Sequence, residues 1–221
     1  MNAATGWTGA LGQGIVAGMQ RRVVLGGLVA AGLVGPARAD GTPALRLVAA
    51  ARSQVGVTIL YDPAYVTLDF PGGDIDRSRG VCTDVVIRAF RDGLGIDLQA
   101  AVNRDMKAAF TSYPQSWGLT RPDRNIDHRR VGNLRRLFER LGAEVAAGEA
   151  FQAGDIVSVM LPGNLPHVMI VSDLAAASGQ PMVLHNIGAG ALEEDRLGEY
   201  PVTGHYRLTP GALERLAALG W

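Results

Sequence analysis

The sequence predicts an α+β fold, in which N-terminal helices pack on an antiparallel sheet of about four to five strands. Apolar residues recur at helical spacing in the first two thirds of the chain, whereas short apolar runs separated by turn residues fill the last third. Helices followed by successive strands are typical of α+β proteins. The 221 residues are 48% apolar, which is enough for one well-cored domain. We expect that domain to cover residues 40–221.

Residues 1–39 are expected to form an export signal. Arg21-Arg22 precedes an apolar run over residues 23–35, and Ala37-Arg38-Ala39 has the small-x-small pattern that signal peptidase cleaves. The run is shorter than the roughly 20 residues of a transmembrane helix, so no stable membrane anchor is expected once the signal is cleaved near Ala39. The double arginine resembles a twin-arginine signal, and Met19 is an alternative start. The sequence therefore predicts a periplasmic protein.

Charge and motif spacing exclude two classes of function. The 21 basic and 21 acidic residues balance, and no basic stripe interleaved with aromatic residues is visible, so no nucleic-acid partner is expected. The four histidines show neither the His-Glu-x-x-His nor the His-x-His spacing of zinc hydrolases. We therefore expect no metal and no other cofactor.

In the first half of the chain we expect two helices with one short extended stretch between them. Thr42-Pro43 is a good helix start, and Gly56 can end that helix. Residues 57–61 form a short extended stretch. A second helix begins near Cys82, with Asp84 in its first turn. Its apolar face contains Val81, Val85, Val86, Ala89 and Phe90.

The remaining elements follow a turn-rich stretch at residues 103–127. Asp127 is a plausible N-cap for a helix over His128–Leu141. Strands are expected at residues 156–160, 167–171, 181–186 and 205–208, and the turn at 161–164 should join the first two as a hairpin. Thr209-Pro210 then begins a C-terminal helix.

Cys82 is the single cysteine and therefore cannot form an intramolecular disulfide. In an oxidising compartment such a thiol is either buried and inert or kept for chemistry. At a helix N-terminus the unpaired N–H groups favour the thiolate, so the position predicts a lowered pKa for the Cys82 thiol. A thiolate is a nucleophile, and a neighbouring imidazole can protonate the leaving amine.

Histidines that could assist Cys82 lie on the expected strands. His167 begins a strand directly after the hairpin turn, where it could face a helix packed on the sheet, and His185 lies on the next strand. A cysteine, a strand histidine and a polar residue on the adjacent strand make a workable catalytic set. Asn186 or His205 could take the third position instead of His185.

Several segments resemble the NlpC/P60 cell-wall peptidases, which have a papain-like fold. They are Ala50 to Gly56 followed by Tyr61, Phe70-Pro71-Gly72-Gly73, Phe151 to Val157, Pro166 to Val171, and Val183-Leu184-His185. The chain is more closely similar to the bacterial domain-of-unknown-function family 1287. That similarity lies in Gly80 to Asp84, Asn125 to Arg130, Leu165-Pro166-His167 and His185 to Gly188. It covers nearly the whole expected mature chain.

The resemblance implies that Cys82 is the nucleophile, His167 the general base and acid, and His185 the orienting residue. The backbone N–H of Cys82 would supply part of an oxyanion hole. The sequence departs from the peptidases in three places: Val81 and Thr83-Asp84 flank the cysteine, the family tyrosine is displaced to Tyr61 or replaced by Phe70, and a segment over about 103–135 is inserted. These departures affect the expected substrate more than the nucleophile.

The function that follows is hydrolysis of an amide bond in peptidoglycan or its peptide fragments through an acyl-enzyme. A non-catalytic envelope binding protein and an acyl or amide transferase with the same triad are the alternatives. Arg129 and Arg130 either lie on a solvated helix face or bind carboxylates, and Trp117 either anchors its loop or stacks on a sugar. Candidate substrate-binding residues are Asp84, Tyr61, Asn186, His128, Arg129 and Trp117.

Overall fold

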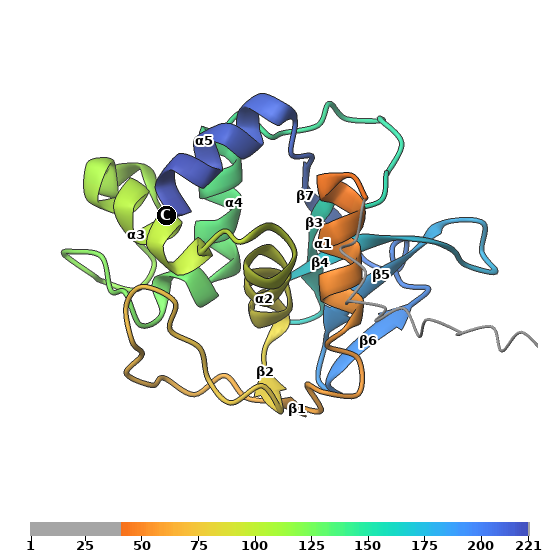
Figure 1. Ribbon diagram of the computed structural model, residues 1–221, viewed down its shortest axis with the longest axis horizontal. Coiled ribbons are helices and arrows are strands. Elements are labelled where there is room, and N and C mark those ends of the chain that lie inside the picture. The colour runs from red at the N-terminus through yellow and green to blue at the C-terminus, as the bar shows by residue number, and fades with distance from the viewer. Residues whose placement is uncertain (1–40, 221) are drawn as a thin grey trace, which may run out of the picture. The chain divides into compact units, whose positions relative to one another are not determined.

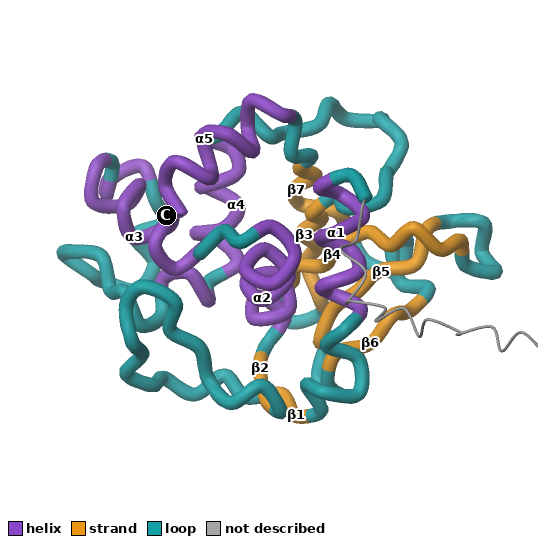
Figure 2. Tube along the Cα trace, in the orientation of Figure 1, coloured by secondary structure: helices purple, strands orange, loops and turns teal. Residues whose placement is uncertain are grey.

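The computed structural model describes residues 41–220, so the expected export signal at residues 1–39 lies outside the described residues. The helices and strands of this part are α1 (Pro43–Arg52), β1 (Leu60–Tyr61), β2 (Arg79–Gly80), α2 (Cys82–Leu94), α3 (Leu98–Ala108), α4 (Val131–Arg140), β3 (Ile156–Leu161), β4 (Leu165–Ala175), β5 (Pro181–Asn186), β6 (Ala191–Glu194), β7 (Val202–Tyr206) and α5 (Pro210–Gly220). Two single-turn 3₁₀ helices, η1 (Phe110–Ser112) and η2 (Asp127–Arg129), lie between α3 and α4. Figures 1 and 2 show helices gathered beside one sheet.

The main sheet has five strands in the order β6-β5-β4-β3-β7, and all of its pairs are antiparallel. β3 and β4 form a hairpin with Val159 opposite His167. Its turn contains Asn164 at a φ of 59°, a left-handed conformation that asparagine tolerates better than most residues. The predicted α+β class, the predicted hairpin and the predicted C-terminal helix are therefore confirmed.

Side chains alternate across the sheet and form two buried clusters. On the helix-covered face, Val168, Ile170 and Leu184 pack with residues of α1, α2 and α4, among them Cys82 and Phe90. On the other face, a smaller cluster contains Val157, Val159, Met169, Val171 and Val183, and Leu197 and Tyr200 cover it. Because successive strand residues face opposite sides, the two clusters show to which face of the sheet each side chain points over residues 167–171 of β4 and 183–185 of β5.

Helix α2 begins at Cys82 and packs beside α1, and both helices contact β4 and β5 (Figure 1). Val81 is its N-cap, and the Asp84 carboxylate accepts a 2.7 Å hydrogen bond from the Val81 backbone N–H. Gly95, with a φ of 69°, ends the helix in the left-handed conformation that glycine adopts most easily. The local sequence thus places the cysteine in the first turn, as predicted.

Three boundaries differ from the predictions. α1 ends at Arg52 rather than at Gly56, because residues 53–57 form tight turns. Asp127 does not cap α4: it begins η2, and Arg130 is the N-cap residue. Helix α3 occupies part of the stretch that the sequence indicated as turns, since Asp97 caps it and its apolar side is buried.

None of the helices in residues 41–220 combines the length and the apolarity that crossing a membrane requires.

Candidate active site

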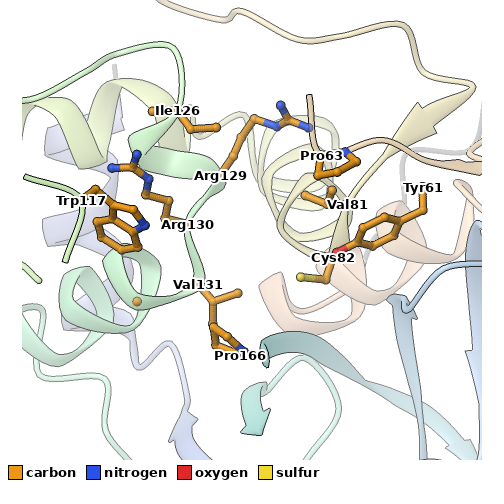
Figure 3. Close-up of a pocket in the computed structure, with 11 residues that line it drawn as sticks. Tyr61, Pro63, Val81, Cys82, Trp117, Ile126, Arg129, Arg130, Val131 and Pro166 are labelled. Atoms are coloured by element: carbon orange, nitrogen blue, oxygen red, sulfur yellow. The ribbon is translucent and has the colours of Figure 1, made fainter. Parts of the chain in front are cut away.

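A cavity of about 230 Å³ opens beside the N-terminus of α2 (Figure 3). Its walls come from the loop after β1, the start of α2, the segment that leads into α4, and the start of β4. The residues that line it are Tyr61, Pro63, Val81, Cys82, Trp117, Ile126, Arg129, Arg130, Val131, Gly132 and Pro166. Figure 3 shows the Cys82 sulfur directed towards the space in front of Val131 and Pro166. The thiol therefore has access to a ligand-sized volume.

The Cys82 thiol is buried, with 4% of the residue exposed. Burial raises the pKa of the thiol to about 11, and the neighbouring Asp84 carboxylate acts in the same direction. Backbone N–H groups of Val168, Thr83 and Cys82 itself point to the sulfur and lower the pKa by less. The predicted lowering of the Cys82 pKa by the helix N-terminus is therefore wrong, because desolvation outweighs the helix. The resting site contains a neutral thiol.

Two histidines and a glutamate form a continuous hydrogen-bond chain across β4, β5 and β6. His167 Nε2 and His185 Nδ1 are 2.8 Å apart, with their rings edge to face. His185 Nε2 lies 3.1 Å from Glu194 Oε2, and Arg196 Nε lies 3.2 Å from the same oxygen. Sequence reasoning missed Glu194, which lies on a short strand with no distinctive motif.

The chain of hydrogen bonds fixes which nitrogens carry protons. Burial lowers the pKa of His167 to about 3, and burial also lowers the pKa of His185 although Glu194 opposes it. Both imidazoles are therefore neutral near pH 7. A carboxylate can only accept, so His185 Nε2–H donates to Glu194 and His185 Nδ1 accepts from His167 Nε2–H. This arrangement leaves the lone pair of His167 on Nδ1.

The Cys82 sulfur lies near the start of β4, but within residues 41–220 no hydrogen bond joins it to the His167 ring. The last β4–β5 pair on this side is Ile170 with Leu184, and the sulfur lies beside the peptide that joins His167 to Val168. By alternation the His167 side chain leaves the strand on the Met169 face, whereas Cys82 packs with Val168. The expected orientation of His167 towards the helix is therefore corrected: its peptide, not its ring, contacts the sulfur.

Tyr61 brings a hydroxyl from β1 to Cys82. Figure 3 shows this hydroxyl next to Cys82. Burial raises the pKa of the Tyr61 phenol to about 12, with further contributions from Cys82 and Asp84. The phenol therefore stays protonated and can donate a hydrogen bond to an atom bound at the sulfur.

Asp84 and Arg129, both expected to bind substrate, bind each other instead. Arg129 Nε and Nη2 each lie 3.0 Å from an Asp84 oxygen, and the two side chains are only 2% and 4% exposed. Arg129 also donates to the carbonyls of Asp62 and Ala64, and the Thr83 hydroxyl donates to the Arg129 carbonyl. These groups hold the cavity wall against α2, and they use four of the five N–H donors of Arg129.

The other candidate residues divide between the cavity and the core. Trp117 lines the cavity, and the guanidinium of Arg130 lies 4.1 Å from the centre of its ring. His128 is buried elsewhere, and burial lowers its pKa to about 3. The Asn186 amide donates to the Gly80 carbonyl.

His205, the alternative third member, donates to Asp155 over 2.6 Å. Of the histidines, His185 is thus the one that contacts His167. Within residues 41–220 no group of three or more His, Cys, Asp or Glu side chains is placed to hold a metal ion.

Comparison with known proteins gives the family. Residues 48–208 match the model of the domain of unknown function DUF1287. The chain is 53% identical over 160 residues to "Uncharacterized protein YijF" of Escherichia coli strain K12. The matched segment covers 71% of this chain and 78% of that protein. It is also similar to the structure of NlpC1 from Trichomonas vaginalis, at 13% identity and a TM-score of 0.43, over 77% of this chain and 46% of that one. The chain therefore belongs to the DUF1287 family.

Proposed function

We propose that this protein is an exported cysteine hydrolase that cleaves an amide bond in peptidoglycan, with Cys82 as nucleophile. The observation that carries the proposal is a thiol in the first turn of a helix, at the wall of a cavity and beside the peptide of a histidine that begins the chain His167–His185–Glu194. The resemblance of the sequence motifs to NlpC/P60 peptidases supports peptidoglycan as the substrate. The pattern of residues 1–39 supports a periplasmic location.

The reaction starts from the neutral pair. As the sulfur attacks the carbonyl carbon, the thiol proton passes to Nδ1 of His167, which holds the free lone pair. Hydrogen bonds from the Cys82 N–H and the Tyr61 hydroxyl stabilise the negative oxygen. The proton then passes from His167 to the departing amine, leaving a thioester that water hydrolyses to regenerate the thiol. His185, held by Glu194, sets the tautomer of His167 in the resting protein. Because the His167 side chain leaves β4 on the Met169 face, opposite Cys82, the mechanism requires this ring to turn away from His185 and towards the sulfur when substrate binds.

Digestion of purified sacculi tests the proposal. The wild-type protein should release muropeptides or free stem peptides, and Cys82→Ala should release none while keeping its circular dichroism spectrum and melting temperature. His167→Gln should lose activity likewise. His128→Gln is the matched control, since His128 is a buried histidine with a lowered pKa that does not line the cavity. Equal product profiles for wild type and Cys82→Ala would refute hydrolysis.

Burial of the thiol favours a second candidate, a non-catalytic envelope binding protein. A cysteine with a raised pKa and no imidazole hydrogen bond is also what an inert core thiol shows. In that case wild type and Cys82→Ala would sediment with sacculi equally and neither would release products. Adding an amine acceptor to the digestion separates a transferase, which would give conjugates.

A further inference from the structure

Arg130 has a different environment from the neighbouring Arg129, although both line the cavity. Each of the three nitrogens of the Arg129 guanidinium has a partner, in Asp84 or in the carbonyls of Asp62 and Ala64. For Arg130 one hydrogen bond is found in the described part of the chain, from Nη1 to Asp127 Oδ1 over 3.2 Å. Since a guanidinium carries five N–H donors, most of those of Arg130 remain for a ligand.

The position of the Arg130 guanidinium is fixed before any ligand binds. Its carbon lies 4.1 Å from the centre of the Trp117 ring, a cation–π contact that holds the plane of the group. The Asp127 oxygen holds one end, and Asp127 is itself fixed by the Asp123 backbone N–H at 2.5 Å. Because Trp117 holds the face of the Arg130 guanidinium and Asp127 holds one end, its other N–H groups remain available for a planar acceptor such as a carboxylate, which can bind with both oxygens.

The rest of the cavity is mainly apolar. Tyr61, Pro63, Val81, Trp117, Ile126, Val131 and Pro166 provide most of its surface. Only 17% of the Arg130 side chain is exposed, and this burial lowers its pKa, although Asp127 and Asp123 act in the opposite direction. A ligand carboxylate is attracted more strongly there than on an open surface, because the partly buried surroundings screen the attraction less.

Figure 3 shows Trp117 and Arg130 on one side of the cavity and Tyr61 and Cys82 on the other, with Val131 and Pro166 between them. A ligand anchored at Arg130 therefore extends across the apolar floor towards the sulfur. A cavity of about 230 Å³ has room for a short acylated peptide rather than for a folded chain.

We infer that Arg130 and Trp117 form a carboxylate-binding subsite, so that the cavity selects peptides with a free carboxylate close to the amide that faces Cys82. The inference rests on the proposed function for the identity of that amide, but the subsite itself is defined by binding alone. Arg130 is thus a specificity-determining residue, and Arg129 fixes the wall on which it lies.

Binding of two probes that differ by one charge tests the subsite without any turnover. The probes are N-acetyl-alanyl-alanine and its C-terminal amide, titrated into the full Cys82→Ala chain and followed by the NMR signal of the Trp117 indole N–H. We expect the free acid to bind about tenfold or more tightly than the amide, as for hydrogen bonds to charged groups. Arg130→Gln should remove that preference, and Arg130→Lys should restore part of it.

Arg136→Gln is the matched control, because Arg136 lies on α4, pairs with Glu139 and does not line the cavity. It should keep the full preference. Equal binding of the two probes, absence of binding by both, or an unchanged preference in Arg130→Gln would overturn the subsite. If sacculi are not cleaved but the preference is found, the hydrolase proposal fails and the subsite stands. If sacculi are cleaved without any preference, the reverse holds.

Discussion

Replacing Asp84 with asparagine should destabilise the fold strongly, although the change removes one charge and almost no volume. Asp84 and Arg129 form two parallel hydrogen bonds of 3.0 Å, and both side chains are almost completely buried. Asparagine can still accept from the Val81 N–H, so the helix cap survives. The guanidinium, however, would be left buried without its counter-charge.

The expected loss is about 3 kcal/mol of unfolding free energy, at the low end of the roughly 3–5 kcal/mol measured when one partner of a buried pair is removed. The lower value is expected because Arg129 keeps the carbonyls of Asp62 and Ala64 as acceptors. For a typical domain stability of about 5–15 kcal/mol, this is a large fraction. Arg129→Met should cost a similar amount by leaving the carboxylate unpaired.

Urea unfolding at pH 7, followed by far-UV circular dichroism, measures these losses by linear extrapolation. The double variant Asp84→Asn with Arg129→Met should lose less than the sum of the two single losses, since neither charge is then left alone. Glu199→Gln, which breaks the exposed pair with Arg196, is the control and should change stability by less than about 0.5 kcal/mol. A loss below about 1 kcal/mol for Asp84→Asn, or additive single losses, would refute the reasoning.

Three further predictions concern the site and the backbone. Glu194→Gln removes the carboxylate that fixes His185, so sacculus digestion should slow at least about tenfold and its pH profile should shift; an unchanged rate and profile would exclude a positioning role. Alkylation of Cys82 by iodoacetamide should accelerate up to a pH of about 11, and a plateau below pH 9 would contradict this. Since the pKa of the Cys82 thiol in the folded protein lies above its ordinary value of 9.0, the stability that the buried thiol contributes is full below pH 9 and is lost as the pH rises towards 11. Gly154→Ala should lower the melting temperature, at a cost of about 1–3 kcal/mol, because the residue has a φ of 84° and an added Cβ would lie 2.8 Å from Ala44; an unchanged melting temperature would contradict it.

Local signals predicted the parts of the fold that depend on neighbours in sequence. Turn residues specified the hairpin, and the apolar face of α2 specified its start at Cys82. Helix α3 was not predicted, since polar residues interrupt its apolar face, and neither was β6, which is only four residues long.

The contact between His167 and His185 was predicted, but the electrostatics around Cys82 and the direction of the His167 ring were not. His167 and His185 meet as the strand order suggested. The burial that raises the Cys82 pKa, and the pairing that removes Asp84 and Arg129 from ligand binding, come from contacts between residues distant in sequence. Spacing along the chain does not encode such contacts. The sequence alone therefore could not show which candidate residues hold the fold together and which remain free to bind a ligand.

The contacts of Arg129 have a consequence for how the loops around the cavity can change. The Arg129 side chain connects three stretches of the chain. It lies on the 3₁₀ turn η2 and binds the loop after β1 through the Asp62 and Ala64 carbonyls and the first turn of α2 through Asp84. Two of these stretches have little regular secondary structure. Because Arg129 donates to main-chain oxygens of the loop, these two hydrogen bonds do not themselves involve a loop side chain. Variation at position 64 can thus proceed without loosening this corner, whereas the Asp62 carboxylate also holds the loop by accepting from the Ala64 N–H over 3.0 Å.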